Sequence, residues 1–100
     1  MTKIKKYVED IADELCSAKD YAEKYLWYKA KSNNMRASKY KEMAMQELEH
    51  ATNLHSFAME DIEVLESVYP EIPQSMMDTW EKSHTEYVEK MAWVKQMLAM

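Results

Sequence analysis

The chain has 100 residues, no glycine, one cysteine and a formal charge of −5 at pH 7. The absence of glycine excludes the phosphate-binding loop, the dinucleotide fingerprint and the nucleophile elbow, because each needs glycine at fixed positions. The single Cys16 excludes an internal disulfide and a thiolate zinc cage. Because no apolar run approaches the roughly 18 residues that cross a bilayer, we expect one cytoplasmic domain over residues 1–100 without a membrane partner.

Helix-breaking residues occur at only two places, Ser32-Asn33-Asn34 and the segment 70–75 with Pro70 and Pro73. They divide the chain into segments of about 2–31, 35–69 and 75–99, in which apolar residues recur at helical spacing. We therefore predict an all-α fold of three long antiparallel helices, ferritin-like or coiled-coil-like. Ser75 and Asp78 have the spacing of a capping box, so we expect them to begin the third helix.

The predicted helices are long for so small a domain. The second would extend about 50 Å at 1.5 Å per residue, and three such rods enclose little interior. Since 47% of the residues are hydrophobic, apolar surface should remain uncovered. We expect oligomerisation of the chain to complete the bundle.

Polar residues interrupt the apolar faces of the second and third predicted helices. Glu47 lies within about 20° of the centre of the second face, and His50 follows one turn later. Glu81 and His84 repeat this Glu-x-x-His spacing in the third segment. A carboxylate oxygen and an imidazole nitrogen so placed are ligands suited to iron or manganese, so all four residues are candidate metal ligands.

Through Ala22-Glu23-Lys24-Tyr25 and Glu47-Leu48-Glu49-His50-Ala51, the chain from Leu15 to Ala58 resembles the ferritin-like and rubrerythrin-like families. The resemblance implies an iron or manganese cofactor and, if the protein is an enzyme, a ferroxidase-like activity. It also implies a carboxylate from the first helix. However, Glu14 and Glu23 lie about 80° to 100° from the centre of that helix's apolar face, so neither is a clear candidate.

The two Glu-x-x-His pairs should lie apart within one chain. His84 comes level with Asp61, which is roughly 20 Å along the helix from Glu47. The pairs would therefore meet only between chains, as in the small encapsulated ferritins, whose metal site is built across a subunit interface.

The same polar residues also have structural interpretations that need no cofactor. Glu47 would form a buried ion pair with Lys19 or Lys95, and His84 would bond to Asp61. His55 lies farther from the apolar face and is expected on the surface.

Charge is segregated along the sequence. Residues 24–41, which we call the tip, hold six cations and no acid, whereas residues 42–89 hold twelve acids and only one lysine. Aromatic rings lie between the cations, a combination that suits stacking on a base beside a phosphate. The predicted ligand-binding residues are Tyr25, Trp27, Tyr28, Lys29, Lys31, Arg36, Lys39 and Tyr40.

The tip should bind an anionic small molecule such as a nucleotide, or a protein target. Extended double-stranded DNA is a poor partner for so acidic a chain. Two alternatives need no ligand: lysines near a helix C-terminus complement its dipole, and the aromatic rings would suit an oligomer contact.

The segments 80–90 and 92–98, together with Glu47-Leu48-Glu49-His50-Ala51, are similar to those of short helical proteins from phages and prophages of gut Firmicutes. This resemblance implies a host protein as a partner and a location in the host cytoplasm or the virion, but no mechanism. Our leading hypothesis is a non-catalytic, oligomeric helical binding protein that uses the tip. The alternatives are a ferritin-like metal protein and a structural phage component.

Overall fold

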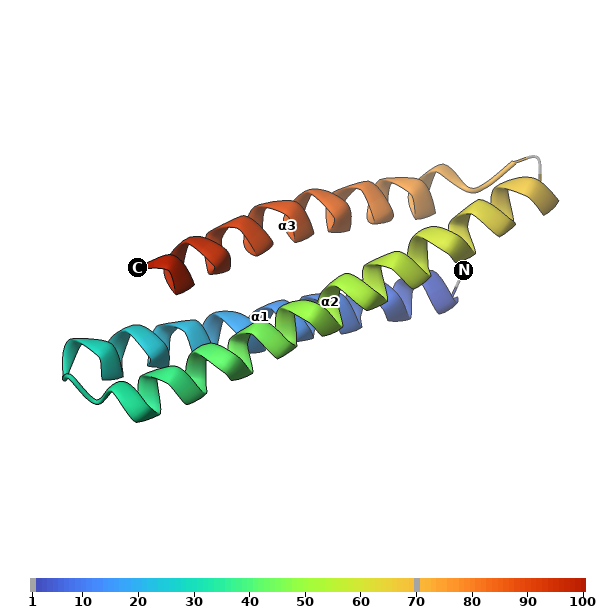
Figure 1. Cartoon of the computed structure of the whole chain (residues 1–100). Helices are drawn as coiled ribbons and strands as arrows, with labels where there is room; N and C mark the ends of the chain where they lie inside the picture. The colour runs from blue at the N-terminus through green and yellow to red at the C-terminus, as the bar shows by residue number, and fades with distance from the viewer. Residues whose placement is uncertain (1, 70) are drawn as a thin grey trace.

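The computed structural model describes residues 2–69 and 71–100, apart from the side chain of Thr2. The elements are α1 (Thr2–Ala30), α2 (Asn34–Val68) and α3 (Gln74–Ala99), with no strand in the described residues (Figure 1). The bundle is elongated and measures 57 × 18 × 17 Å. The predicted all-α fold of three helices is confirmed, and every helix end lies within one residue of its expected position.

The turn between α1 and α2 is built without glycine. Ser32 adopts a left-handed conformation with φ 60°, which costs on the order of 1 kcal/mol for a residue with a Cβ. The backbone N–H of Asn33 donates to the carbonyl oxygen of Tyr28 at 3.0 Å. The Asn33 side chain in turn accepts the N–H of Arg36 at 3.2 Å and caps α2.

The predicted capping box at the start of α3 is wrong. The N-cap residue is Pro73, and no side chain caps the helix. Because α3 begins at Gln74, Ser75 is already inside it and its carbonyl oxygen accepts the hydroxyl of Thr79 at 2.9 Å. The Asp78 carboxylate accepts the side-chain amide of Gln74 at 2.8 Å instead.

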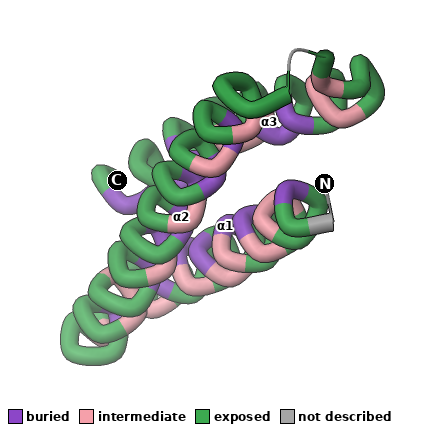
Figure 2. The backbone as a smooth tube through the Cα atoms, turned by 90° about the vertical axis from the view of Figure 1, so that its right-hand side faces the viewer, coloured by how far each residue is buried: buried purple, intermediate pink, exposed green. Residues whose placement is uncertain are grey.

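Small residues hold α1 and α2 close together. Four alanines recur every seven residues along α2 and are all buried: Ala37, Ala44, Ala51 and Ala58. Ala18 and Ala22 of α1 are also fully buried. Because alanine extends no farther than Cβ, the two backbones can approach closely, and Figure 2 shows the buried residues running along the inward faces of the helices.

The third helix packs mainly on α1 and lies less close to α2. Its buried residues Met91, Val94 and Leu98 belong to the same core as Ile4, Ile11 and Leu15. The N-terminus of α1 lies near the α2–α3 connection, and the C-terminus of α3 lies nearer the α1–α2 turn (Figure 1). Many apolar side chains stay exposed, as expected from the composition: Trp27, Met35, Met43, Met45, Phe57, Met59, Val64, Val68, Tyr69, Val88, Trp93 and Met100.

Candidate metal centre

Two carboxylates and an imidazole converge on one side of the α1–α2 hairpin. Glu14 comes from α1, while Glu47 and His50 lie one turn apart on α2. The Nδ1 atom of His50 is 3.5 Å from the Glu14 carboxylate and 3.8 Å from that of Glu47. One ligand atom from each residue lies within 4.8 Å of the others. In residues 2–69 and 71–100, this is the one group of three or more acidic, histidine or cysteine side chains so arranged.

The electrostatics of this cluster favour a bound cation. The Glu14 carboxyl raises the pKa of Glu47 above its usual value through a shared hydrogen bond, and desolvation of Glu47 raises it further. Proximity of His50 acts in the opposite direction and lowers the pKa. The Glu14 and Glu47 carboxylates repel each other when both are ionised. A divalent ion bound between them would remove that repulsion.

The spacing of the cluster fits the bond lengths of a transition metal. When an ion forms bonds of about 2.1 Å, two of its ligand atoms lie about 3.0 Å apart if they are at right angles and about 4.2 Å apart if they are on opposite sides of the ion. Both His50–carboxylate distances, 3.5 and 3.8 Å, lie in this range. The His50 side chain is 56% exposed, whereas the Glu14 side chain is 29% exposed and the Glu47 side chain 22%. The site is therefore half-buried and open on the His50 side.

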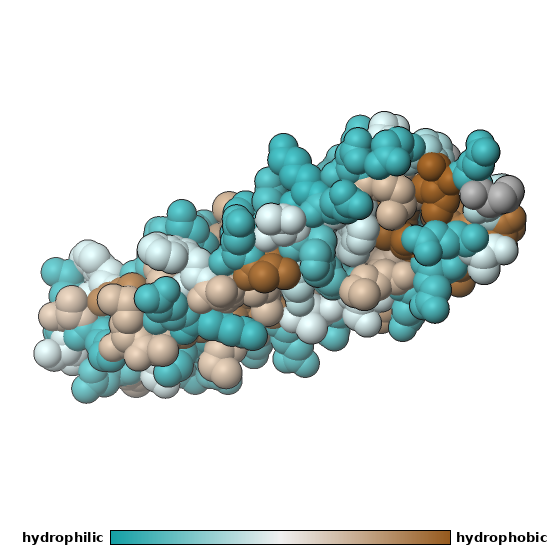
Figure 3. Space-filling view, turned by 90° about the horizontal axis from the view of Figure 1, so that it is seen from above, coloured by the Kyte–Doolittle hydropathy of each residue, from teal (hydrophilic) through white to brown (hydrophobic). Residues whose placement is uncertain are grey.

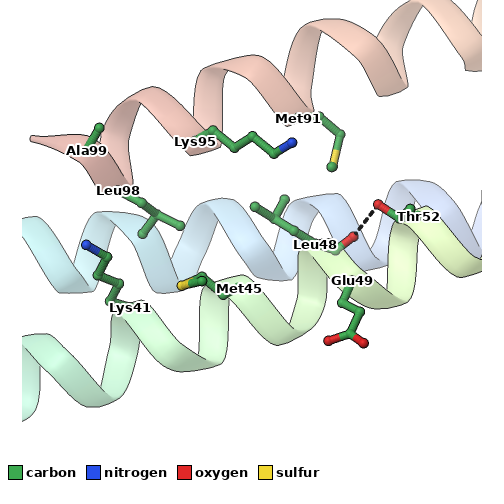
Figure 4. A pocket seen from close by; sticks show the side chains of 9 residues that line it. All are labelled: Lys41, Met45, Leu48, Glu49, Thr52, Met91, Lys95, Leu98 and Ala99. Carbon is green, nitrogen blue, oxygen red and sulfur yellow. Dashed lines mark hydrogen bonds between the residues drawn. The ribbon is translucent and has the colours of Figure 1, made fainter.

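The ion pairs expected for Glu47 with Lys19 or Lys95 are not formed. Lys19 lies 3.9 Å from Glu23 of its own helix. Lys95 lines a cavity of about 430 Å³ between α2 and α3. Figure 4 shows its side chain directed across this cavity, near Leu48 and Met91.

The other expected ligands, Glu81 and His84, do not join the cluster. Glu81 is exposed on α3, and the Nδ1 atom of His84 is 2.9 Å from the Nε2 atom of His55. The predicted hydrogen bond from His84 to Asp61 is wrong, because Asp61 pairs with Lys3 at 3.0 Å. The surface position predicted for His55 is also wrong: it is 7% exposed and stacks on Tyr87 with ring centroids 4.1 Å apart.

The tip brings several of its predicted ligand-binding residues together, but on two sides of the hairpin. Tyr28 and Tyr40 stack with centroids 5.5 Å apart, and Trp27 meets Tyr28 edge-on at 4.9 Å. Lys31 lies 4.4 Å from the centroid of the Trp27 ring, and Arg36 lies 5.6 Å from that of Tyr28. These cations thus already pack on the protein's own rings.

Tyr25 and Lys29 lie on another side of the tip. Tyr25 is buried, and Lys29 donates hydrogen bonds to its hydroxyl and to the backbone oxygen of Met100. Lys39 is exposed on α2. The eight predicted residues therefore do not form one pocket.

No protein-family model, curated protein or solved structure matches this chain. Within the described residues, none of the helices has an apolar stretch sufficient to cross a membrane.

Proposed function

We propose that the protein binds a divalent transition-metal ion, of the iron or manganese class, through Glu14, Glu47 and His50. The convergence of these three side chains from two helices carries the proposal, with all ligand atoms within 4.8 Å of one another. Mixed carboxylate and imidazole ligands suit such ions. A glutamate facing a Glu-x-x-His pair is also the donor set that ferritin-like carboxylate proteins use.

The three side chains have different roles in this site. Glu14 and Glu47 supply the negative charge that balances the ion, while His50 supplies a neutral nitrogen ligand from the exposed edge. Three protein ligands leave coordination positions open to water or to a ligand from a second copy. Iron held by these residues would supply one-electron redox chemistry, so the activity that this proposal includes is a ferroxidase-like one, the oxidation of Fe²⁺ with dioxygen as the electron acceptor.

Metal content tests the proposal directly. The untagged protein, purified without chelator and then incubated with Fe²⁺ or Mn²⁺, should retain about one ion per chain or per two chains in elemental analysis and native mass spectrometry. Glu47→Gln should lose that ion, because it removes one anionic ligand. Glu49→Gln, two residues away and exposed, is the matched control and should keep it. A metal-free wild type, or metal retained by Glu47→Gln, would contradict the proposal.

The stability of the chelated protein gives a second test. Removing the charge of Glu47 also removes its repulsion with Glu14, so Glu47→Gln should unfold at a temperature about 2 °C higher in EDTA. This corresponds to about 0.5 kcal/mol, the scale of solvent-screened charge pairs. If Glu47 instead formed a stabilising pair, the same variant would unfold at a lower temperature.

A second candidate function is anion binding at the tip. It is favoured by a cavity of about 600 Å³ beside Lys24, Trp27, Tyr28 and Tyr40, although Asp20 and Glu23 also line it. The variant Tyr28→Ala with Lys24→Glu changes two residues that line this cavity and should abolish binding of a nucleotide measured by calorimetry; unchanged binding would exclude the cavity. A defined assembly with neither ligand nor metal would instead favour the structural phage component.

A further inference from the structure

The two ends of the rod have complementary surfaces. The tip at the α1–α2 turn contains six cations and no acid. At the opposite end, residues 60–78 contain six acids and no lysine or arginine: Glu60, Asp61, Glu63, Glu66, Glu71 and Asp78. We call this opposite end the acidic end. The start of α1 also brings three lysines there: Lys3 pairs with Asp61, Lys6 pairs with Asp10, and Lys5 is exposed.

The acidic end also carries an apolar cavity. Its volume is about 410 Å³, and it is lined by Leu65, Tyr69, Glu71, Ile72, Pro73 and Met76. Nearby Val64 and Val68 are 60% and 62% exposed. Figure 3 shows apolar side chains gathered at this end of the molecule. A cavity of this size accepts an aromatic side chain, and its acidic surroundings favour one that is flanked by cations.

The tip presents such a side chain. The indole of Trp27 is 57% exposed, although it is one of the largest apolar groups in the chain. Lys31 lies over its ring at 4.4 Å, and Lys24 lines the hollow beside it, on the side where Asp20 and Glu23 also lie. Trp27 therefore offers an apolar ring that fits the cavity of the acidic end, and its two lysines offer positive charge that complements the acids around that cavity.

We infer that copies of this chain associate head to tail, with Trp27 of one copy seated in the Leu65–Met76 cavity of the next. The two surfaces lie at opposite ends of a rod 57 Å long, so one chain cannot satisfy both by itself. A contact between two different surfaces leaves one free surface of each kind at the ends of the assembly. Association therefore continues beyond the dimer and forms linear chains of rods.

The size of the contact makes this association weak. The cross-section of the bundle, 18 × 17 Å, limits the area buried to on the order of 300 Å² from each partner. Stable protein interfaces bury about 800 Å² on each side. Since the contact also depends on opposite charges, it should weaken about tenfold or more between low salt and about 1 M NaCl, where the screening length is only about 3 Å.

Sedimentation velocity of the full-length protein in EDTA tests the inference, because the chelator separates it from metal binding at Glu14, Glu47 and His50. At low salt the average sedimentation coefficient of the wild type should rise steadily with protein concentration. Glu66→Lys with Glu71→Lys reverses two of the six charges of the acidic end, and Lys24→Glu with Lys31→Glu reverses two of the six charges of the tip. Each double variant alone should lose the rise, as should Trp27→Ala.

Mixing Glu66→Lys/Glu71→Lys with Trp27→Ala tests the polarity of the contact. The first variant keeps its tip and the second keeps its acidic end. The two altered surfaces, one with two new lysines and the other a basic tip without its indole, no longer complement each other, so an equal mixture should form pairs and nothing longer. The control Glu49→Lys with Glu89→Lys changes the net charge by the same amount as Glu66→Lys with Glu71→Lys, but at exposed positions away from the ends. It should associate as the wild type does. Circular dichroism checks that every variant is folded.

Three outcomes would overturn the inference. They are a monomeric wild type at all concentrations, association that survives either charge reversal, and failure of the mixture to form pairs. A dimer of fixed size in every variant would indicate a symmetric side-by-side contact instead.

Discussion

Replacing His55 with phenylalanine should make the fold less sensitive to acid. His55 lies between α2 and α3, 7% exposed, with its ring 5.1 Å from Trp80 and stacked on Tyr87. Burial lowers its pKa below the usual 6.5, and the neighbouring His84 lowers it further. The exposed His84 contacts this ring from the solvent side, with its Nδ1 atom 2.9 Å from the Nε2 atom of His55. Protonation of His55 would therefore place a charge in a buried ring between three other rings.

The magnitude follows from proton linkage. Below pH 6.5 the imidazole of His55 is protonated in the unfolded chain but stays neutral in the folded one. The unfolded state therefore binds more protons, and the free energy of unfolding falls as the pH falls. The loss is at most about 1.36 kcal/mol per pH unit, or about 2 kcal/mol by about pH 5. For 100 residues, an unfolding entropy of about 0.2 kcal/mol/K converts this to at most about 10 °C.

Thermal unfolding followed by circular dichroism at about pH 7.5 and pH 5 measures the effect. His55→Phe keeps a ring against Tyr87 and Trp80 but cannot take up a proton, so it should lose fewer degrees on acidification than the wild type. Asn53→Phe adds a phenylalanine at an exposed position of the same helix without removing an imidazole, and it should leave the wild-type loss in place. An equal loss in His55→Phe and the wild type would refute the reasoning.

Two further predictions concern the α1–α2 hairpin. Ala51→Leu adds three carbons at a position that is 0% exposed, so overpacking should cost about 2 kcal/mol and lower the unfolding temperature by about 10 °C. The control Asn53→Leu, at an exposed position, should have little effect. Asn33→Ala removes the oxygen that accepts the Arg36 N–H and should cost about 1 kcal/mol in urea unfolding, whereas Asn34→Ala should not, since Asn34 already lies inside α2.

Sequence periodicity is sufficient to predict the helices because each one must bury a continuous apolar stripe. Ile4, Ile11, Leu15 and Ala18 are spaced for one helical face and are all buried in the core. The partners of individual polar groups depend instead on how α3 lies across the hairpin. The apolar pattern of α2 alone predicts His55 on the surface, yet Trp80 and Tyr87 of α3 cover it. A pattern within one helix carries no information about such covering.

Glu14 shows why two of the three residues of the candidate site could be predicted and the third could not. Glu47 and His50 lie one turn apart on one helix, so their proximity follows from helical geometry alone. Glu14 lies far from the centre of its own apolar face, so the sequence does not predict it as a ligand. However, it directly precedes the buried Leu15, just as Glu47 directly precedes the buried Leu48. The two glutamates thus hold equivalent positions beside the same seam. Because the alanines of that seam let the backbones approach, two side chains that each flank the interface reach one another across its edge.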